Sequence, residues 1–393
     1  MSDSIVQFVR WPSYSADEIA AALRVLESGK VNYWTGTEGR EFEKEYASHV
    51  GTRHAVAVAN GTAALELALA VFDIGPGDEV ITTPRTFIAS ASCAIMRGAT
   101  PIFADVDRDT QNITASTIEK VMTKRTRAVI PVHLAGWPCE MDEIMDLARQ
   151  NNLVVIEDCA QANGAALRGR PVGGIGDAGA FSFCQDKIIT TAGEGGMLTI
   201  SDETRWSRAW SYKDHGRNLE LADGQGHPPG YRWIHDTFGT NWRLTEVQSA
   251  IGRVQLRKLS QTVQQRNANA AILLNGLSRI AGIRVPAPPP YVQHAYYKFY
   301  AFVEPAALRS GWDRDRIMAE IAAMGVPCFS GSCPEVYLEK AFESSRSRPS
   351  ERLPIARELG ETSLMFVVHP TLGAEQMHRT VDAAAIVMQR ATK

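Results

Sequence analysis

The chain has 393 residues, and its 41 lysines and arginines against 44 aspartates and glutamates give a formal charge of −3 at pH 7. This near-neutral balance argues against a nucleic-acid partner, which would require a concentrated basic surface. Apolar residues at 45% and charged residues at 22% are ordinary globular values, and a chain of this length usually forms two domains.

No apolar run approaches the roughly 20 residues needed to cross a bilayer. The first residues also lack the basic-then-apolar pattern of a signal peptide. We therefore expect a soluble, cytoplasmic protein without a membrane partner. Six cysteines are scattered without a CxxC pair or the spacing of a zinc site, so we expect reduced thiols and no metal.

In chain order, an arm and a helix at Asp17–Ser28 are expected first, and apolar segments then alternate with helical ones. The expected strands are Ala55–Asn60, Glu79–Thr83, Pro101–Val106, Ala128–Leu134 and Leu153–Glu157. The expected helices are Glu41–Val50, Thr62–Phe72, Ile88–Arg97, Ala115–Thr123 and Met141–Asn151. Apolar strands separated by helices predict an α/β fold with a mainly parallel sheet covered on both faces.

The second half of the chain begins with two strands, Ala178–Phe183 and Gly196–Ser201, and continues with a long connecting helix, Leu244–Leu274. A proline-rich linker at 287–290 precedes a smaller α+β domain. That domain has a strand at Tyr296–Val303, a helix at Arg314–Met324 and a C-terminal helix from Ala374. We divide the chain into an N-terminal arm and helix (1–35), a large cofactor-binding domain (36–260), and the end of the connecting helix with the small domain (261–393).

Ligands in open α/β sheets bind outside the carboxyl ends of the strands, and three such ends carry polar residues here. The first is the segment Asn60-Gly61-Thr62-Ala63, which closes a strand and opens a helix. Free N–H groups and the positive end of the helix dipole favour a phosphate at such a position. A simple helix cap is the alternative, and neither a Walker loop nor a GxGxxG motif is present.

The second strand end carries Asp158, whose buried carboxylate requires a partner such as a protonated heteroaromatic nitrogen; a capping role is the alternative. The third carries Lys187, which precedes a glycine-rich segment at 190–196. A desolvated lysine can lose its proton and form a Schiff base. A phosphate cradle, a counter-ion for a pyridine ring and a Schiff-base lysine together describe a pyridoxal 5′-phosphate site.

With these motifs the sequence resembles the DegT/StrS-type sugar aminotransferases, a family of fold-type I pyridoxal-phosphate enzymes. The matching stretches are NGTAAL, EDCAQANGA, RGRPVGGIGDAGAFSFCQDK, the Glu194-Gly195-Gly196 turn and FGTNWRLTEVQSAIG. The resemblance implies a large domain with a mainly parallel, seven-stranded-type sheet flanked by helices, and a smaller C-terminal α+β domain.

The resemblance also implies roles for individual residues. Lys187 would bind the cofactor aldehyde and move protons, and Asp158 would pair with the pyridine nitrogen. Gln161 would lie near the phenolic oxygen of the ring, and Phe87 would stack on the ring, although core packing is an equally open interpretation of Phe87. The residues that would hold the phosphate are Gly61, Thr62, Ala63 and Ser182.

Two further residues each have a functional and a structural interpretation. Asn241 matches an asparagine that reaches the phosphate of the neighbouring subunit, so the resemblance implies a homodimer with shared active sites. A place in a helix-entry turn is the alternative for Asn241. His133 ends a strand on the same edge of the sheet, where a ligand-facing place and a purely structural role are both open.

Relatives that dehydrate their substrate replace the lysine with histidine, so Lys187 implies transamination. The amino group of L-glutamate or L-glutamine would pass to a nucleotide-linked keto sugar in amino-sugar biosynthesis, or alternatively to a keto-inositol in aminocyclitol biosynthesis. The acceptor pocket is expected to use Val31–Gly36 and Phe329–Cys333. A non-catalytic sugar-binding regulator is the alternative of a different class, although such a protein would need neither Lys187 nor Asp158. A nicotinamide oxidoreductase is disfavoured because its glycine fingerprint is missing.

Overall fold

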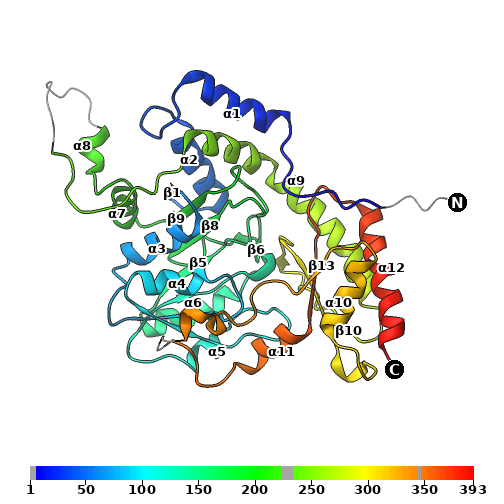
Figure 1. Ribbon diagram of the computed structural model, residues 1–393. Coiled ribbons are helices and arrows are strands. Elements are labelled where there is room, and N and C mark those ends of the chain that lie inside the picture. The colour runs from blue at the N-terminus through cyan, green and yellow to red at the C-terminus, as the bar shows by residue number, and fades with distance from the viewer. Residues whose placement is uncertain (1–5, 224–232, 344, 346) are drawn as a thin grey trace.

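The computed structural model describes residues 6–223, 233–343, 345 and 347–393. A seven-stranded sheet with the order β1-β9-β8-β5-β4-β2-β3 lies at its centre, between helices (Figure 1). These strands are β1 (His54–Val58), β2 (Glu79–Thr82), β3 (Thr100–Phe103), β4 (Thr126–Ile130), β5 (Val154–Asp158), β8 (Ala178–Ser182) and β9 (Gly196–Ile200). The pairs from β8 to β3 are parallel, and β9 alone runs antiparallel to both of its neighbours. The mainly parallel α/β fold expected from the sequence is confirmed.

Helices cover both faces of this sheet because the strands are apolar on both sides. Val56 and Val58 of β1 belong to the core beneath α3, whereas Ala55 and Ala57 belong to the core beneath α2. The helices are α1 (Ala16–Ser28), α2 (Glu38–Val50), α3 (Gly61–Val71), α4 (Ala89–Met96), α5 (Ala115–Glu119), α6 (Met141–Asn151), α7 (Glu203–Lys213), α8 (Leu219–Asp223), α9 (Glu246–Leu277), α10 (Arg314–Ala323), α11 (Pro354–Thr362) and α12 (Ala374–Ala391).

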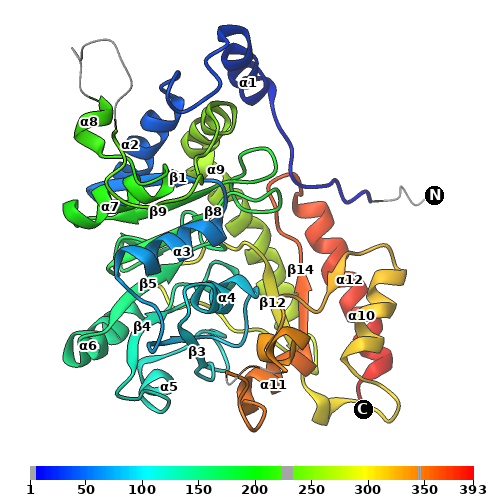
Figure 2. The same cartoon turned by 60° about the vertical axis from the view of Figure 1, so that its left-hand side comes forward.

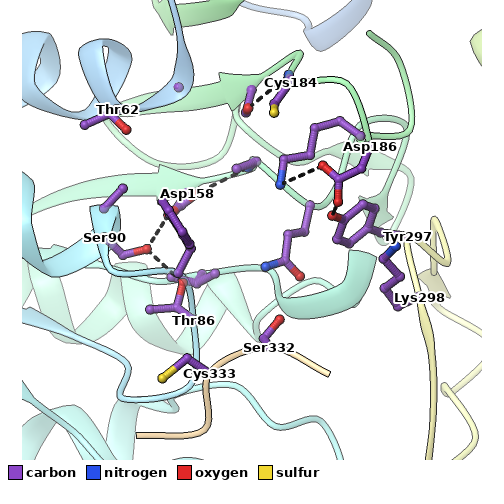
Figure 3. A pocket seen from close by; sticks show the side chains of 18 of the residues that line it. Thr62, Thr86, Ser90, Asp158, Cys184, Asp186, Tyr297, Lys298, Ser332 and Cys333 are labelled. Carbon is purple, nitrogen blue, oxygen red and sulfur yellow. Dashed lines mark hydrogen bonds and ion pairs between the residues drawn. The ribbon is translucent and has the colours of Figure 1, made fainter. Parts of the chain in front are cut away.

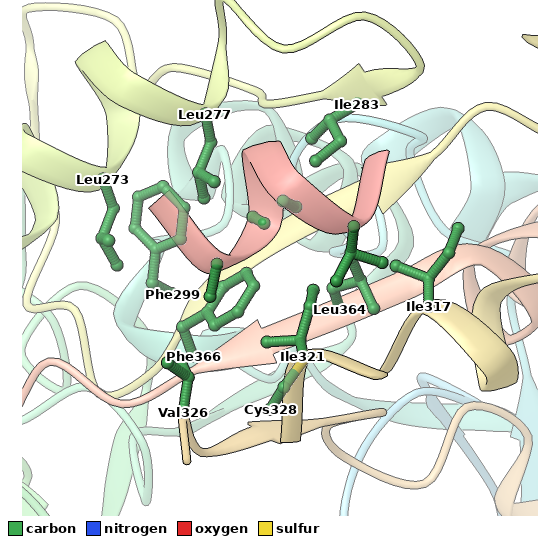
Figure 4. Close-up of a cluster of buried hydrophobic side chains, with 14 of the residues drawn as sticks. Leu273, Leu277, Ile283, Phe299, Ile317, Ile321, Val326, Cys328, Leu364 and Phe366 are labelled. Carbon is green, nitrogen blue, oxygen red and sulfur yellow. The ribbon is translucent and has the colours of Figure 1, made fainter. Parts of the chain in front are cut away.

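A second, antiparallel sheet is built from the C-terminal part of the chain and has the order β10-β12-β14-β13. Its strands are β10 (Ile283–Arg284), β12 (Phe299–Val303), β13 (Cys328–Phe329) and β14 (Ser363–Phe366). Phe299 and Phe366 pack against Leu273 and Leu277 of α9 and against residues of α10 and α12 (Figure 4). A small sheet of β11 (Val292–Gln293), β6 (Ala166–Leu167) and β7 (Arg170–Pro171) joins this region to the large sheet.

The long helix α9 links the two regions and is capped by Thr245, whose hydroxyl accepts a hydrogen bond from the Gln248 N–H at 3.3 Å. The domain boundaries stay a prediction, and the one expected at residue 260 falls inside this continuous helix. Before α1, the N-terminal arm at 6–15 runs along the molecule towards α12 (Figures 1 and 2).

Several elements are shorter than the sequence predicts. The strand expected from Tyr296 begins at Phe299 because Tyr296 has a φ of 44°, which no extended strand allows. The helix expected to end at Thr123 ends at Glu119. Within the described ranges, we find no helix with the length and apolarity to span a membrane.

Candidate active site

A cavity of about 630 Å³ lies where the carboxyl ends of the large sheet face the small antiparallel sheet. One side is formed by the starts of α3 and α4 and by the ends of β5 and β8, and the opposite side by the segments around β12 and β13. Figure 3 shows Thr62, Ser90 and Asp158 on one side of it, and Tyr297 and Lys298 on the other. A ligand here would therefore contact both sheets.

Asp158 is the last residue of β5, and its carboxylate reaches this cavity although the residue is only 4% exposed. The Ser90 hydroxyl donates to one carboxylate oxygen at 2.7 Å and the Ala160 N–H to the other at 3.1 Å. Thr86 in turn lies 2.8 Å from the Ser90 oxygen (Figure 3). Burial raises the pKa of Asp158, and no cationic side chain in the described ranges forms an ion pair with it. A protonated ring nitrogen would supply the missing charge.

Lys187 lies in the loop after β8, and its side chain also lines the cavity. Its Nζ is 3.8 Å from Asp186 Oδ1 and 4.9 Å from the centroid of the Tyr297 ring. Tyr297 donates its hydroxyl to the other oxygen of Asp186. Burial opposes ionisation of Asp186, but the ammonium of Lys187 and the Tyr297 hydroxyl outweigh it and lower the pKa of this carboxyl.

The loop that carries Lys187 is also held by backbone contacts. The Lys187 N–H donates to the Cys184 carbonyl at 3.0 Å, and the Lys187 carbonyl accepts from the indole N–H of Trp11 at 2.9 Å. The N-terminal arm therefore contacts the same loop as the small sheet does. These two contacts fix the backbone from which the Lys187 side chain enters the cavity.

The start of α3 forms the remaining end of the cavity, with Gly61 and Thr62 among the lining residues. A Cβ at Gly61 would lie 2.8 Å from Ser182 Cβ, so glycine is required for the close approach of the helix to β8. Ser182 also lines the cavity. Ala63 does not, and its N–H donates to the capping side chain of Asn60 at 2.9 Å. Three of the four predicted phosphate ligands are thus brought together at a helix N-terminus.

Phe87 and Gln161 line the same cavity. Phe87 is 69% exposed, which excludes core packing in this chain as the explanation for an aromatic residue there. The side-chain oxygen of Gln161 accepts from the Ala135 N–H at 2.9 Å. This bond leaves the amide N–H groups of Gln161 available to a ligand.

Two of the predicted site regions lie elsewhere. Asn241 is exposed and forms a bridge with Asp214, away from the cavity of its own chain. The segment Val31–Gly36 does not line the cavity either, and its Trp34 donates to Asp214 at 2.7 Å. By contrast, the last part of Phe329–Cys333 does line it, through Gly331, Ser332 and Cys333.

His133 has a structural place and does not face the cavity. Its Nδ1 accepts from the Cys139 N–H at 3.0 Å, so the proton lies on Nε2, which contacts Glu157 at 3.0 Å. Glu157 also accepts three backbone N–H groups, at Gly173, Ile175 and Gly176. These bonds occupy the atoms through which the buried group His133, Glu157 and Cys159 could hold a metal ion.

Several lining residues were not identified from the sequence: Thr86, Ser90, Asp186, Tyr297, Lys298 and Tyr300. Thr86 lies three residues before the start of α4 and Ser90 is the second residue of that helix, so no helix-face spacing in the sequence links the two. Tyr300 belongs to β12, and Tyr297 and Lys298 directly precede that strand, so no local pattern could connect them with Lys187. The residues present fit pyridoxal phosphate: an unpaired buried carboxylate, an amine and a helix N-terminus share one cavity.

Comparison with known proteins also indicates a pyridoxal-phosphate enzyme. Residues 12–385 match the DegT/DnrJ/EryC1/StrS aminotransferase family. The GDP-perosamine synthase of Caulobacter vibrioides is 36% identical, over 89% of this chain and 91% of that protein. The dTDP-3-amino-3,4,6-trideoxy-alpha-D-glucose transaminase of Streptomyces venezuelae is 34% identical, over 94% and 91%. A putative L-glutamine:3-amino-2,3-dideoxy-scyllo-inosose aminotransferase of Streptoalloteichus tenebrarius is 36% identical, over 96% and 93%.

Solved structures agree with these relatives. An aminotransferase from Psychrobacter cryohalolentis superposes with a TM-score of 0.96 at 52% identity, over 98% of this chain and 99% of that one. A putative sugar aminotransferase of Streptococcus pneumoniae in its PLP form has a TM-score of 0.86 at 25% identity, over 96% and 97%. The chain belongs to the DegT/DnrJ/EryC1/StrS aminotransferase family and is a pyridoxal-phosphate-dependent sugar aminotransferase.

Proposed function

We propose that this enzyme transfers the amino group of L-glutamate or L-glutamine to a nucleotide-linked keto sugar during amino-sugar biosynthesis. One observation carries the proposal: Lys187, Asp158 and the start of α3 face a single cavity. The GDP- and dTDP-linked products in the names of two relatives support the nucleotide-linked acceptor.

Pyridoxal phosphate, when bound, supplies an aldehyde for the amine of the donor and a ring that withdraws electrons from the donor's α-carbon. Lys187 Nζ would hold this aldehyde, and the same amine would take up and return the proton at the donor's α-carbon. Asp158 would keep the ring nitrogen protonated, and Ser90 and the Ala160 N–H orient Asp158 for this contact.

The remaining predicted residues position the cofactor. Phe87 would stack on the ring, Gln161 would donate to the phenolic oxygen, and Gly61, Thr62 and Ser182 would hold the phosphate. The contact predicted for Ala63 would require Asn60 to give up its cap, because the Ala63 N–H is already paired with it.

We further propose a homodimer in which Asn241 reaches the phosphate of the neighbouring subunit. Asn241 is exposed in the single chain and lies outside its own cavity, as a residue serving a neighbour would. Phe238, three residues earlier, is fully exposed, which for a large aromatic side chain supports a place in a subunit contact. The cytoplasmic location stays a prediction.

The first test of the proposed function is the colour of the purified enzyme. The purified enzyme should be yellow, lose its colour on addition of L-glutamate or L-glutamine, and regain it with the correct acceptor. Borohydride reduction and peptide mapping should place the cofactor on Lys187. A protein that stays yellow with every amino donor is the outcome expected for a non-catalytic regulator.

A keto-inositol acceptor is the second candidate, because the Streptoalloteichus tenebrarius relative carries a scyllo-inosose in its name. A panel of nucleotide-linked keto sugars and free keto-inositols, added to the amino form of the enzyme, would separate the two. Recovery of the yellow colour with the inositols alone would replace the proposed acceptor.

A further inference from the structure

Asp186 directly precedes Lys187 in the chain and lines the same cavity. Its Oδ1 is 3.8 Å from Lys187 Nζ, and within the described ranges no other carboxylate forms an ion pair with this amine. The side chain of Lys187 is 16% exposed and that of Asp186 is 48% exposed, so water screens the pair only in part. The free amine of Lys187 therefore lies beside a negative charge.

Tyr297 fixes the direction of the Asp186 carboxylate. The Tyr297 hydroxyl donates to Asp186 Oδ2, which leaves Oδ1 for Lys187 (Figure 3). The backbone of Tyr297 is itself held, because its N–H donates to the Ala135 carbonyl at 2.8 Å and its carbonyl accepts from Arg266 Nη1 at 3.2 Å. Burial and the charge of Asp186 raise the pKa of Tyr297, so its hydroxyl stays a donor at neutral pH. One oxygen of Asp186 is thus reserved for the amine.

The surroundings of the amine favour its protonated form. Although burial opposes it, Lys187 and the Tyr297 hydroxyl lower the pKa of Asp186, so this carboxylate is ionised at neutral pH. Lys298 and Arg266 add positive charge beside Asp186 and act in the same direction. The face of the Tyr297 ring, whose centroid is 4.9 Å from Lys187 Nζ, also attracts a cation. A nearby carboxylate and an aromatic face both stabilise an ammonium relative to a neutral amine.

The other ionisable groups near Lys187 do not replace Asp186. Asp158 forms no ion pair with this amine in the part of the chain that the structure describes, and it is the proposed partner of the ring nitrogen. Lys298 carries a positive charge of its own. Cys184, on the same loop, is a neutral thiol because burial raises its pKa. The two carboxylates can therefore serve two different cations, Asp158 the ring nitrogen and Asp186 the amine.

We infer that Asp186 is a positioning residue that holds the amine of Lys187 once this amine has taken up the α-proton of the donor. This inference rests on the proposed function and assigns a second carboxylate to its proton transfer. In that step the C–H bond at the α-carbon breaks, its electron pair is left on the carbon, and the proton forms a third N–H bond on Nζ. The neutral amine becomes an ammonium, whose charge Asp186 matches until the proton is returned.

The first test measures the proton affinity of Lys187 in the cofactor-free enzyme and needs no turnover. Acetic anhydride acylates only neutral amines, so labelling at a series of pH values, followed by peptide mapping, gives the pH midpoint for this one lysine. The midpoint should fall by about one pH unit in Asp186→Asn, because a partly exposed opposite charge is lost. Tyr297→Phe keeps the charge but not its direction, and should lower the midpoint by less.

Each variant has a matched control. Asp382→Asn removes an exposed carboxylate. Tyr291→Phe removes another hydrogen bond from a tyrosine to a carboxylate, that of Glu140 at 2.9 Å, outside the cavity. Both controls should keep the wild-type midpoint, and Asp186→Glu should recover part of the shift because it returns the charge. A purely structural contribution of Asp186 would change how fully Lys187 is labelled at high pH but would leave the midpoint in place.

The second test is the rate of bleaching with a saturating amino donor, measured by stopped flow. Asp186→Asn should retain the bound cofactor and its yellow colour but bleach about tenfold more slowly, the factor that corresponds to one pH unit. Asp186→Glu should recover part of this rate.

Two results would overturn the inference. One is a labelling midpoint in Asp186→Asn equal to that of the Asp382→Asn control. The other is slower bleaching with an unchanged midpoint, which would make Asp186 a structural contact only. If Asp186→Asn does not fold, the same two results in Tyr297→Phe, compared with Tyr291→Phe, decide. Failure of the proposed function is distinguishable, because it would appear as no bleaching in the wild type while the midpoint still depends on Asp186.

Discussion

Replacing Asp158 with asparagine should change stability and activity in opposite directions. The carboxylate is 4% exposed and lacks a cationic partner in the cofactor-free chain, so its charge destabilises the fold at neutral pH. Asparagine retains the shape: its Oδ1 can accept from the Ala160 N–H, and its Nδ2 can donate to Ser90, whose own O–H then turns to Thr86. The cofactor-free Asp158→Asn variant should therefore melt at a higher temperature than the wild type at pH 7.

The pH dependence of this effect has a definite sign. Burial raises the pKa of Asp158 in the folded protein above the value of about 3.9 expected in the unfolded chain. The contribution of Asp158 to stability is then fully present below the unfolded value and is lost as the pH rises through the folded one. The advantage of the asparagine variant should grow as the pH rises through this range and vanish in stronger acid.

With the cofactor bound, the proposed role of Asp158 predicts that the same substitution removes the partner of the protonated ring nitrogen. Removing one partner of a buried ion pair costs about 3–5 kcal/mol. If that loss falls on the transition state, the donor half-reaction slows by about two to four orders of magnitude. Stopped-flow loss of the yellow absorbance with L-glutamate measures this rate, and thermal melting of the cofactor-free protein measures stability.

The exposed Asp382→Asn variant is the control, since it removes a carboxylate far from these contacts. An Asp158→Asn protein that melts below the wild type when cofactor-free and still bleaches at the wild-type rate would refute the reasoning. Such a result would mean that a different group compensates the ring nitrogen.

Three further predictions follow from the geometry. Lys187→Ala should abolish turnover and borohydride trapping but still bind the cofactor without a covalent link, as equilibrium dialysis would show. Ser90→Ala should shift the acidic limb of the pH–rate profile upward, because losing its hydrogen bond raises the pKa of Asp158 further, whereas Ser92→Ala on the same helix should leave the profile unchanged. Asn241→Ala and Lys187→Ala proteins should each be inactive alone but recover part of the activity when mixed and allowed to exchange subunits; no recovery would contradict the shared site.

The cavity residues predicted from the sequence share one property. Each lies at the end of a strand or the start of a helix, where neighbouring residues form a recognisable pattern. Gly61 and Thr62 follow a strand and open a helix, and Lys187 precedes a run of glycines. Tyr297 and Lys298 have no such pattern, since they lie just before β12 of the small sheet and approach Lys187 only in the folded chain. Trp11 is a similar case, because 176 residues separate it from its partner Lys187.

Glu157 and Asp158, the two neighbouring carboxylates at the end of β5, have different environments that the sequence alone does not distinguish. Successive side chains of a strand point to opposite faces. Glu157 points into the protein, where His133 and three backbone N–H groups outweigh the cost of burial and lower its pKa. Asp158 points into the cavity with two donors and no cation, so its pKa is raised. One position along the strand therefore separates a satisfied structural charge from an unsatisfied one, and only the unsatisfied charge can be completed by a ligand.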